Sequence, residues 1–182
     1  MFTKGPELYF GEGQKVDAYN FTRAQLPPYW IGIGLARIAR FSGNGNLSVS
    51  VAQHSVNLSE LVGHDVDLQR AALMHDVPEL FTGDVPSPIK RLCPDLLAID
   101  QRIVARISEV YLIPLTAFEV IHEADGRIAE DEKLYMFRSL EQSDYEKAHQ
   151  RRFGIDVQPW SRSEAAEAWT ARFNELFDLE TH

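Results

Sequence analysis

"AALMHDVPELFTGDVPSPIKRL", residues 71–92, places a His-Asp pair at the end of an apolar run, before a glutamate and a loop of glycine and prolines. His75 follows Leu68 at the i+7 spacing of a helix, so its ring is predicted on the inward, apolar face. Asp76 lies beside it, and Glu79 lies one helical turn further on. The stretch therefore predicts a helix that carries ionisable groups into the interior.

Helical periodicity extends over most of the remaining chain. Apolar residues recur at the spacing of amphipathic helices. Asp67 is the predicted N-cap of the helix that leads to His75, and Ser161 with Glu164 has capping-box spacing before the last helix. The predicted helical segments are residues 29–41, 48–62, 68–80, 99–110 and 116–140, and a final segment after Ser161.

Two strand-like runs lie near the N-terminus. Residues 7–21 contain them around Gly11–Gly13, which predicts a small β-hairpin. The expected fold class is therefore an all-α bundle with an N-terminal hairpin. A chain of 182 residues with 45% hydrophobic content fits one domain. Its expected parts are an extension (1–27), a motif-bearing core (28–140) and a C-terminal helical part (141–182).

The composition limits the partners that the chain is expected to bind. Lys and Arg total 18 against 27 Asp and Glu, so a nucleic-acid polymer is not expected as a partner. The single cysteine, Cys93, cannot form an internal disulfide, and the N-terminal residues lack the basic and apolar regions of a signal peptide. No run approaches the roughly 18 apolar residues of a membrane span. We therefore expect a cytoplasmic protein without membrane contact.

Two further ionisable residues fall on predicted apolar faces. His54 lies four residues before Leu58, and Asp125 lies three before Ile128. A single inward histidine is more often a hydrogen-bonded core residue than a metal ligand. An inward aspartate is harder to explain as core, because burying an unpaired carboxylate costs several kcal/mol and normally requires a cation or donors.

Together these groups form a mixed nitrogen and oxygen ligand set. His54, His75, Asp76 and Asp125 come from three predicted helices, and such a set suits a borderline divalent transition metal. One such ion (Co, Mn, Zn, Fe or Ni) is the expected cofactor. Asp76 is predicted as both ligand and catalytic residue. Glu79 is either an acid–base group of the same site or an ordinary solvated residue at a helix end.

Three successive motifs resemble those of the HD-domain phosphohydrolases. They are SVAQHS (50–55), AALMHDVPELFTGD followed by PSPIKR (71–91), and HEADGRIAEDE (122–132). The resemblance covers roughly Trp30 to Tyr135 and is strongest to the bacterial 5′-deoxynucleotidases and the phage dATP triphosphohydrolases. It implies an HD-domain helical bundle in which the four ligands hold the metal and Glu79 handles the proton of the attacking water. Additional Mg on the substrate phosphates is left open.

The resemblance also implies substrate-binding residues. Asp84 corresponds to a residue near the sugar, Lys90 to a lysine that contacts phosphate, and Arg40 to an arginine that precedes the first histidine. Phe41 stands where these relatives often have tryptophan, so stacking on a base would come from a phenyl ring. Arg37 is close enough in sequence to take the place of Arg40.

The expected function is metal-dependent hydrolysis of deoxynucleotides, with water attacking the α-phosphorus. The leading version cleaves a dNTP such as dATP to deoxynucleoside and tripolyphosphate, because Lys90 and Arg40 resemble a phosphate clamp. The alternative cleaves a dNMP and releases phosphate. A cyclic nucleotide or a nucleotide alarmone also remains open, as does a non-catalytic scaffold that binds metal or nucleotide.

The partners expected are the small-molecule deoxynucleotide and further copies of this chain. The relatives imply a homo-oligomer, a dimer or higher. The apolar stripe of Trp169, Phe173 and Phe177 fits either the core or a subunit interface. The setting would be the cytoplasm of a bacterium, or of the host of a phage.

Overall fold

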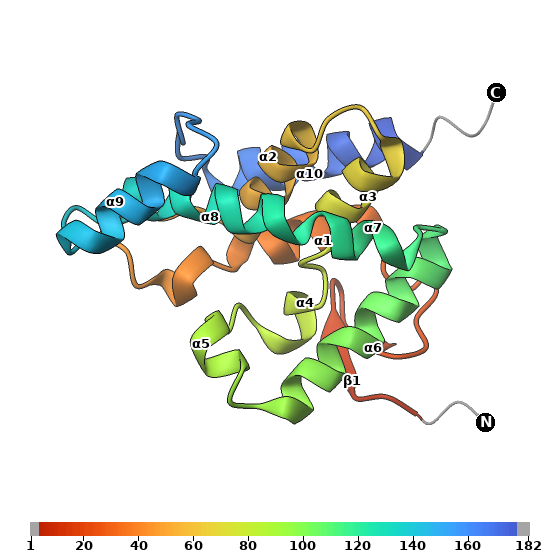
Figure 1. Cartoon of the computed structure of the whole chain (residues 1–182). Coiled ribbons are helices and arrows are strands. Elements are labelled where there is room, and N and C mark those ends of the chain that lie inside the picture. The colour runs from red at the N-terminus through yellow and green to blue at the C-terminus, as the bar shows by residue number, and fades with distance from the viewer. Residues whose placement is uncertain (1–3, 178–182) are drawn as a thin grey trace.

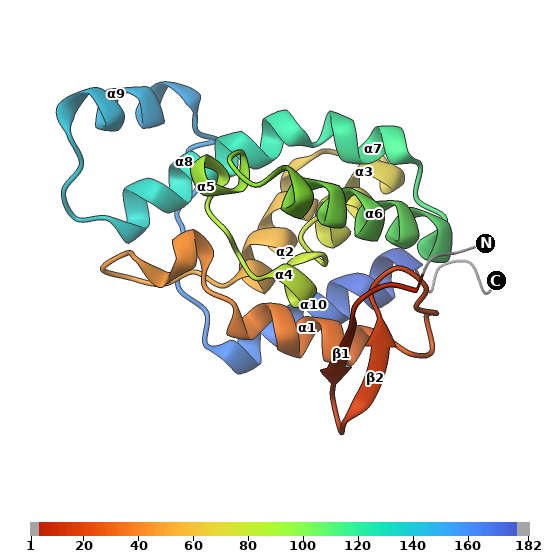
Figure 2. The same cartoon turned by 90° about the horizontal axis from the view of Figure 1, so that it is seen from below.

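The structure is a computed structural model and describes residues 4–177. Its first regular element is a short antiparallel hairpin. β1 (Glu7–Phe10) pairs with β2 (Gln14–Asp17), as the sequence predicts. The turn packs against the first helix, since a Cβ at Gly11 would lie 2.6 Å from the Trp30 indole. The hairpin therefore covers the start of that helix (Figure 2).

Helices form the rest of the regular structure, which confirms the predicted all-α bundle (Figure 1). Among the described residues, no helix is both long enough and apolar enough to cross a membrane. The elements are α1 (Pro28–Arg37), the 3₁₀ turn η1 (Arg40–Gly43), α2 (Val51–Leu61), α3 (Val66–Met74), α4 (Glu79–Thr82), α5 (Ser87–Lys90), α6 (Pro94–Tyr111), α7 (Leu115–Val120), α8 (His122–Met136), α9 (Gln142–Arg151) and α10 (Arg162–Phe177).

The core lies where α1, α2 and α3 pack against α10 (Figure 1). Trp169, Phe173 and Phe177 are buried there, so the aromatic stripe belongs to the core of the chain. Gly32 allows α1 to approach α10 closely, since a Cβ on it would lie 2.9 Å from the Ala166 carbonyl oxygen. This packing holds α2 and α3 side by side, and both carry predicted ligands.

The helix predicted over residues 68–80 has different bounds in the structure. α3 begins after Asp65, whose carboxylate accepts from the backbone N–H groups of Asp67 and Leu68, so Asp67 is not the N-cap. α3 ends at Met74, and a turn separates it from α4.

The His-Asp pair lies at the start of this turn. Pro78 has no backbone N–H and cannot continue the hydrogen bonding of α3. In a straight helix, adjacent residues point about 100° apart around the axis. His75 keeps helical backbone angles (φ −63°, ψ −34°), and Asp76 Oδ1 still lies 3.1 Å from His75 Nε2.

Residues 116–140, predicted as one helix, form two. α7 and α8 meet at Ile121, and α8 ends at Met136. Neither proline nor glycine lies between Ala117 and Ala124, so the usual breaker residues do not mark this junction in the sequence. Asp125 therefore lies in the first turn of α8, close to the junction.

Candidate metal centre

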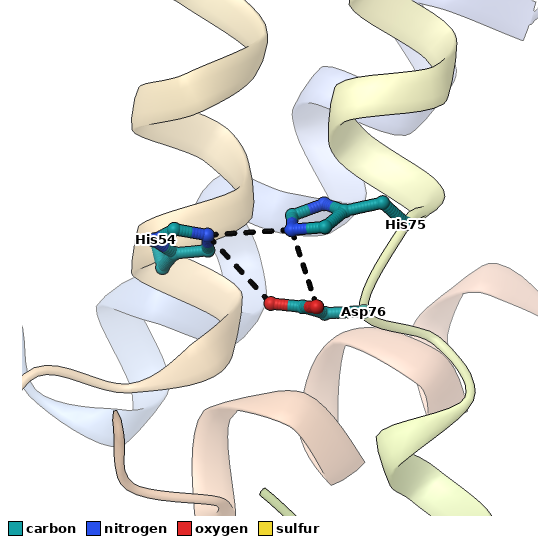
Figure 3. A group of neighbouring side chains, drawn as sticks. All are labelled: His54, His75 and Asp76. Atoms are coloured by element: carbon teal, nitrogen blue, oxygen red, sulfur yellow. Dashed lines mark hydrogen bonds and ion pairs between the residues drawn. The ribbon is translucent and has the colours of Figure 1, made fainter. Parts of the chain in front are cut away.

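Three donor side chains converge where α3 ends beside α2 (Figure 3). His54 projects from the middle of α2, His75 lies at the C-terminus of α3, and Asp76 follows in the turn. One ligand-type atom from each residue lies within 4.8 Å of the others. This group could hold a metal ion.

The distances bring the fourth predicted ligand, Asp125, next to this group of three. The Nε2 atoms of His54 and His75 lie 3.4 Å apart. Asp76 Oδ1 lies 3.1 Å from His75 Nε2, and its Oδ2 lies 3.6 Å from His54 Nε2. Asp125, from α8, brings Oδ1 to 3.1 Å from His54 Nε2 and 3.8 Å from His75 Nε2. Two imidazoles beside two carboxylates form a donor set that fits a divalent transition metal.

A backbone contact fixes the orientation of His75. Its Nδ1 donates to the carbonyl oxygen of Ala72 at 2.8 Å. Because a carbonyl oxygen only accepts, the neutral ring keeps its hydrogen on Nδ1 and turns the Nε2 lone pair toward the centre. α3 therefore positions this ligand through its own last turn.

Glu132, which the sequence prediction did not include, contacts the other histidine. Its side chain is fully buried on α8, and Oε1 accepts from His54 Nδ1 at 2.8 Å. A signal for it exists in the sequence, because Glu132 lies four residues after Ile128 and seven after Asp125, on one face of the helix. The predicted apolar stripe of α8 thus contains two carboxylates.

Arg40 is the cation that the structure brings to the ligands. Its Nε donates to Glu132 Oε2 at 3.1 Å, and its Nη1 lies 3.4 Å from Asp76 Oδ2. Its Nη2 lies 3.9 Å from Asp125 Oδ1. Arg37 is exposed, so the structure favours Arg40 over this alternative.

A strained turn holds Arg40 in place. Phe41 and Ser42 both adopt the left-handed region, with φ of 53° and 52°. Such conformations cost about 1–3 kcal/mol each in residues other than glycine and gather at functional sites. The Phe41 ring packs edge-on against Phe137, with centroids 5.6 Å apart, and is half-buried. The Arg40 guanidinium carbon lies 5.9 Å from its centroid.

The two predicted substrate-binding residues that follow α4, Asp84 and Lys90, contact different parts of the protein. Asp84 adjoins the strained turn, where its Oδ2 accepts from the Ser42 N–H at 3.3 Å. Lys90 instead forms an ion pair with Asp100 of α6, with Nζ 2.7 Å from Oδ2. Asp84 is thus placed beside Arg40 and Phe41, whereas Lys90 is held on the α6 side.

The charges at the centre shift its pKa values. Burial would lower the pKa of His75, but the charge of Asp76 and the hydrogen bonds to Asp125 and Asp76 raise it well above 6.5. Burial and the Arg40 guanidinium would lower the pKa of His54, and Glu132 and Asp125 raise it overall. Burial would raise the pKa of Asp76, yet His75 beside it lowers it to about 2. A cation that enters must therefore displace the protons of the histidines.

Glu79 is a buried acid beside this cluster. Its side chain is 5% exposed, and within residues 4–177 its Oε2 has no hydrogen-bond partner. Burial, followed by the charges of Asp76 and Asp84, raises its pKa to about 9. A buried carboxyl oxygen without a hydrogen-bond partner normally costs stability.

Glu79 is expected to make the metal-free protein less stable as the pH rises. The unfolded chain loses this proton near pH 4.5, whereas the folded chain keeps it up to about pH 9. The free energy of unfolding therefore falls as the pH rises from about 4.5 to about 9, by up to about 1.4 kcal/mol per pH unit. Glu79→Gln removes this titration and leaves the histidines unchanged.

Urea unfolding in a chelator, at a series of pH values from 5 to 9, measures the effect. The free energy of unfolding of the native chain is expected to fall relative to that of Glu79→Gln as the pH increases. Parallel pH profiles for the two proteins would show that Glu79 titrates normally.

Comparison with known proteins adds relatives without assigned functions. No protein-family model matches the chain. It is 39% identical over 95 residues to the uncharacterized protein YfdR of Escherichia coli, with 52% of each chain covered. It is 31% identical over 110 residues to an uncharacterized protein of Rhodobacter capsulatus, with 56% of each covered. The chain thus spans about half the length of the curated relatives it matches.

Proposed function

We propose that this chain is a metal-dependent phosphohydrolase of deoxynucleotides with an HD-type centre. The observation that carries the proposal is that His54, His75 and Asp76 converge with Asp125 next to them. Beside them lies the buried Glu79, whose Oε2 has no hydrogen-bond partner within residues 4–177. The motif resemblance supplies the substrate class, and the geometry supports the chemistry.

A divalent cation at this centre would acidify water and offset phosphate charge. Glu79 can hold a proton at neutral pH and pass it to the leaving oxygen, or accept one from water when the Asp76 charge is offset. Arg40, already beside the ligands, can turn its Nη atoms to phosphate oxygens. The chain therefore has groups for moving a proton and for binding an anion.

Two versions of the reaction fit. A dNTP would give deoxynucleoside and tripolyphosphate, and this remains the leading version from the resemblance. The ion pair between Lys90 and Asp100 favours the dNMP version. With Lys90 paired, Arg40 is the cation beside the ligands for binding phosphate, and a monophosphate carries less negative charge than a triphosphate. In both, water adds to the α-phosphorus and the bond to the 5′-oxygen breaks.

The test is to assay the purified chain with Co²⁺ or Mn²⁺ against dAMP and dATP in ¹⁸O-water, and to follow the products by ³¹P NMR. Attack at phosphorus is expected to place ¹⁸O in phosphate from dAMP, or in the terminal group of tripolyphosphate from dATP. AMP and ATP serve as controls for the deoxyribose preference. No turnover of either deoxynucleotide, with metal bound, would contradict the proposal and favour a non-catalytic scaffold.

A further inference from the structure

Three consecutive acids of α8 are buried, and they have different partners. Glu130 forms ion pairs with Lys133 and Arg151. Asp131 accepts three backbone N–H groups, from residues 153–155, and so anchors the segment before α10. Glu132 contacts His54 and Arg40, both at the candidate centre. Two of the acids thus support the fold, and the third supports the site.

We propose that Glu132 is a positioning residue that holds a metal ligand and an anion-binding arginine with one carboxylate. Each of its two oxygens accepts one hydrogen bond. Oε1 accepts from His54 Nδ1, and Oε2 accepts from Arg40 Nε. The inference rests on the proposed metal centre and assigns a role to a residue outside the ligand set.

The contact with His54 sets which nitrogen is available. The carboxylate keeps the hydrogen on Nδ1, so the neutral ring presents Nε2 to the space shared with His75. Because His54 and Glu132 are both completely buried, water cannot easily replace either partner. Loss of the negative charge would weaken the hydrogen bond from Nδ1 and make Nε2 less basic.

The contact with Arg40 sets where the positive charge lies. Holding Nε leaves Nη1 and Nη2 directed at Asp76 and Asp125, within 4 Å of each. A cation that neutralises these two carboxylates would release the Nη atoms for an anion bound beside it. The rigid carboxylate therefore links the orientation of a ligand to the position of the guanidinium.

Glu132→Gln in the full chain tests the inference through metal binding. It keeps the shape of the side chain but removes the charge, and the Kd for Zn²⁺, measured by calorimetry, is expected to rise about 10–100-fold. The matched control is Glu130→Gln, the same change two residues away, which is expected to leave the Kd unchanged. Glu132→Asp keeps the charge but shortens its reach, so an intermediate Kd is expected from it.

A second measurement addresses Arg40. With the centre saturated by Zn²⁺, inorganic phosphate is expected to bind more weakly to Glu132→Gln than to the native chain. Circular dichroism checks that each variant is folded; should Glu132→Gln not fold, the Kd of Glu132→Asp decides in its place.

The outcomes separate the two proposals. If the native chain binds no metal, the proposed centre is wrong, and this inference is wrong with it. If the native chain binds Zn²⁺ and folded Glu132→Gln or Glu132→Asp binds it equally well, the centre stands and the positioning role is overturned. Equal weakening by Glu130→Gln would also overturn it, since the effect would then come from α8 in general.

Discussion

His75→Ala is expected to weaken metal binding by more than about 100-fold, since even the partners of ligands are typically worth about 10–100-fold. The ring supplies an Nε2 that lies within 4 Å of the donor atoms of His54, Asp76 and Asp125. Its removal leaves one imidazole and two carboxylates, a harder and more open donor set. Metal content after dialysis and a Co²⁺ titration measure the loss, and hydrolysis is expected to disappear with the metal.

The control for this variant is His64→Ala. His64 is exposed in the turn between α2 and α3, away from the donor cluster, so the variant is expected to keep both metal and activity. If His75→Ala retained the metal content of the native chain, the metal would bind elsewhere, and the assignment of the centre would fail.

Periodicity predicted much of this centre because helices repeat their faces. His54 and Asp125 lie on apolar stripes of two helices, and the structure brings them to 3.1 Å. The His-Asp pair was predicted on the same inward face, and its side chains lie 3.1 Å apart at the centre. The bounds of the helix were wrong, because α3 ends at Met74 and not at the end of the predicted segment 68–80.

Glu132 shows where the sequence pattern was read incompletely. It shares a helix face with Asp125 and Ile128. Its neighbours in "AEDEK" are also charged, however, and such a run is typical of a solvent-exposed surface. Its burial depends on His54 and Arg40, which are 78 and 92 residues away in the sequence. Periodicity gives the face of a helix but not the partner that meets it.

The residues expected to bind substrate depend on loops, and loop geometry does not follow from periodicity. The left-handed conformations of Phe41 and Ser42 place Arg40 against the ligands and set Asp84 beside the turn. Neither residue is a glycine, so the sequence gives no sign of this conformation. The pairing of Lys90 with Asp100 likewise joins two segments that the motif does not link.

Glu79→Gln is expected to lower turnover by about 10²–10⁴-fold while the metal content stays unchanged. The carboxyl is buried beside Asp76, and its Oε2 has no partner within the described chain. An amide of the same shape fills this space but cannot exchange a proton, so binding of the metal and of phosphate should persist. The measurements are kcat with the preferred deoxynucleotide, metal content, and the affinity for inorganic phosphate.

The separation of metal binding from turnover distinguishes this role from its alternatives. Substitution of a metal ligand would remove both metal binding and turnover, as His75→Ala should. Substitution of a structural residue would lower the stability of the protein before it affected metal binding or turnover. If the variant keeps its metal but loses turnover, Glu79 is the residue that transfers a proton in the reaction. Its raised pKa keeps that proton bound at neutral pH in the metal-free chain. Full activity in Glu79→Gln would instead require the proton to move through another group, and Glu79 would then have no part in the reaction.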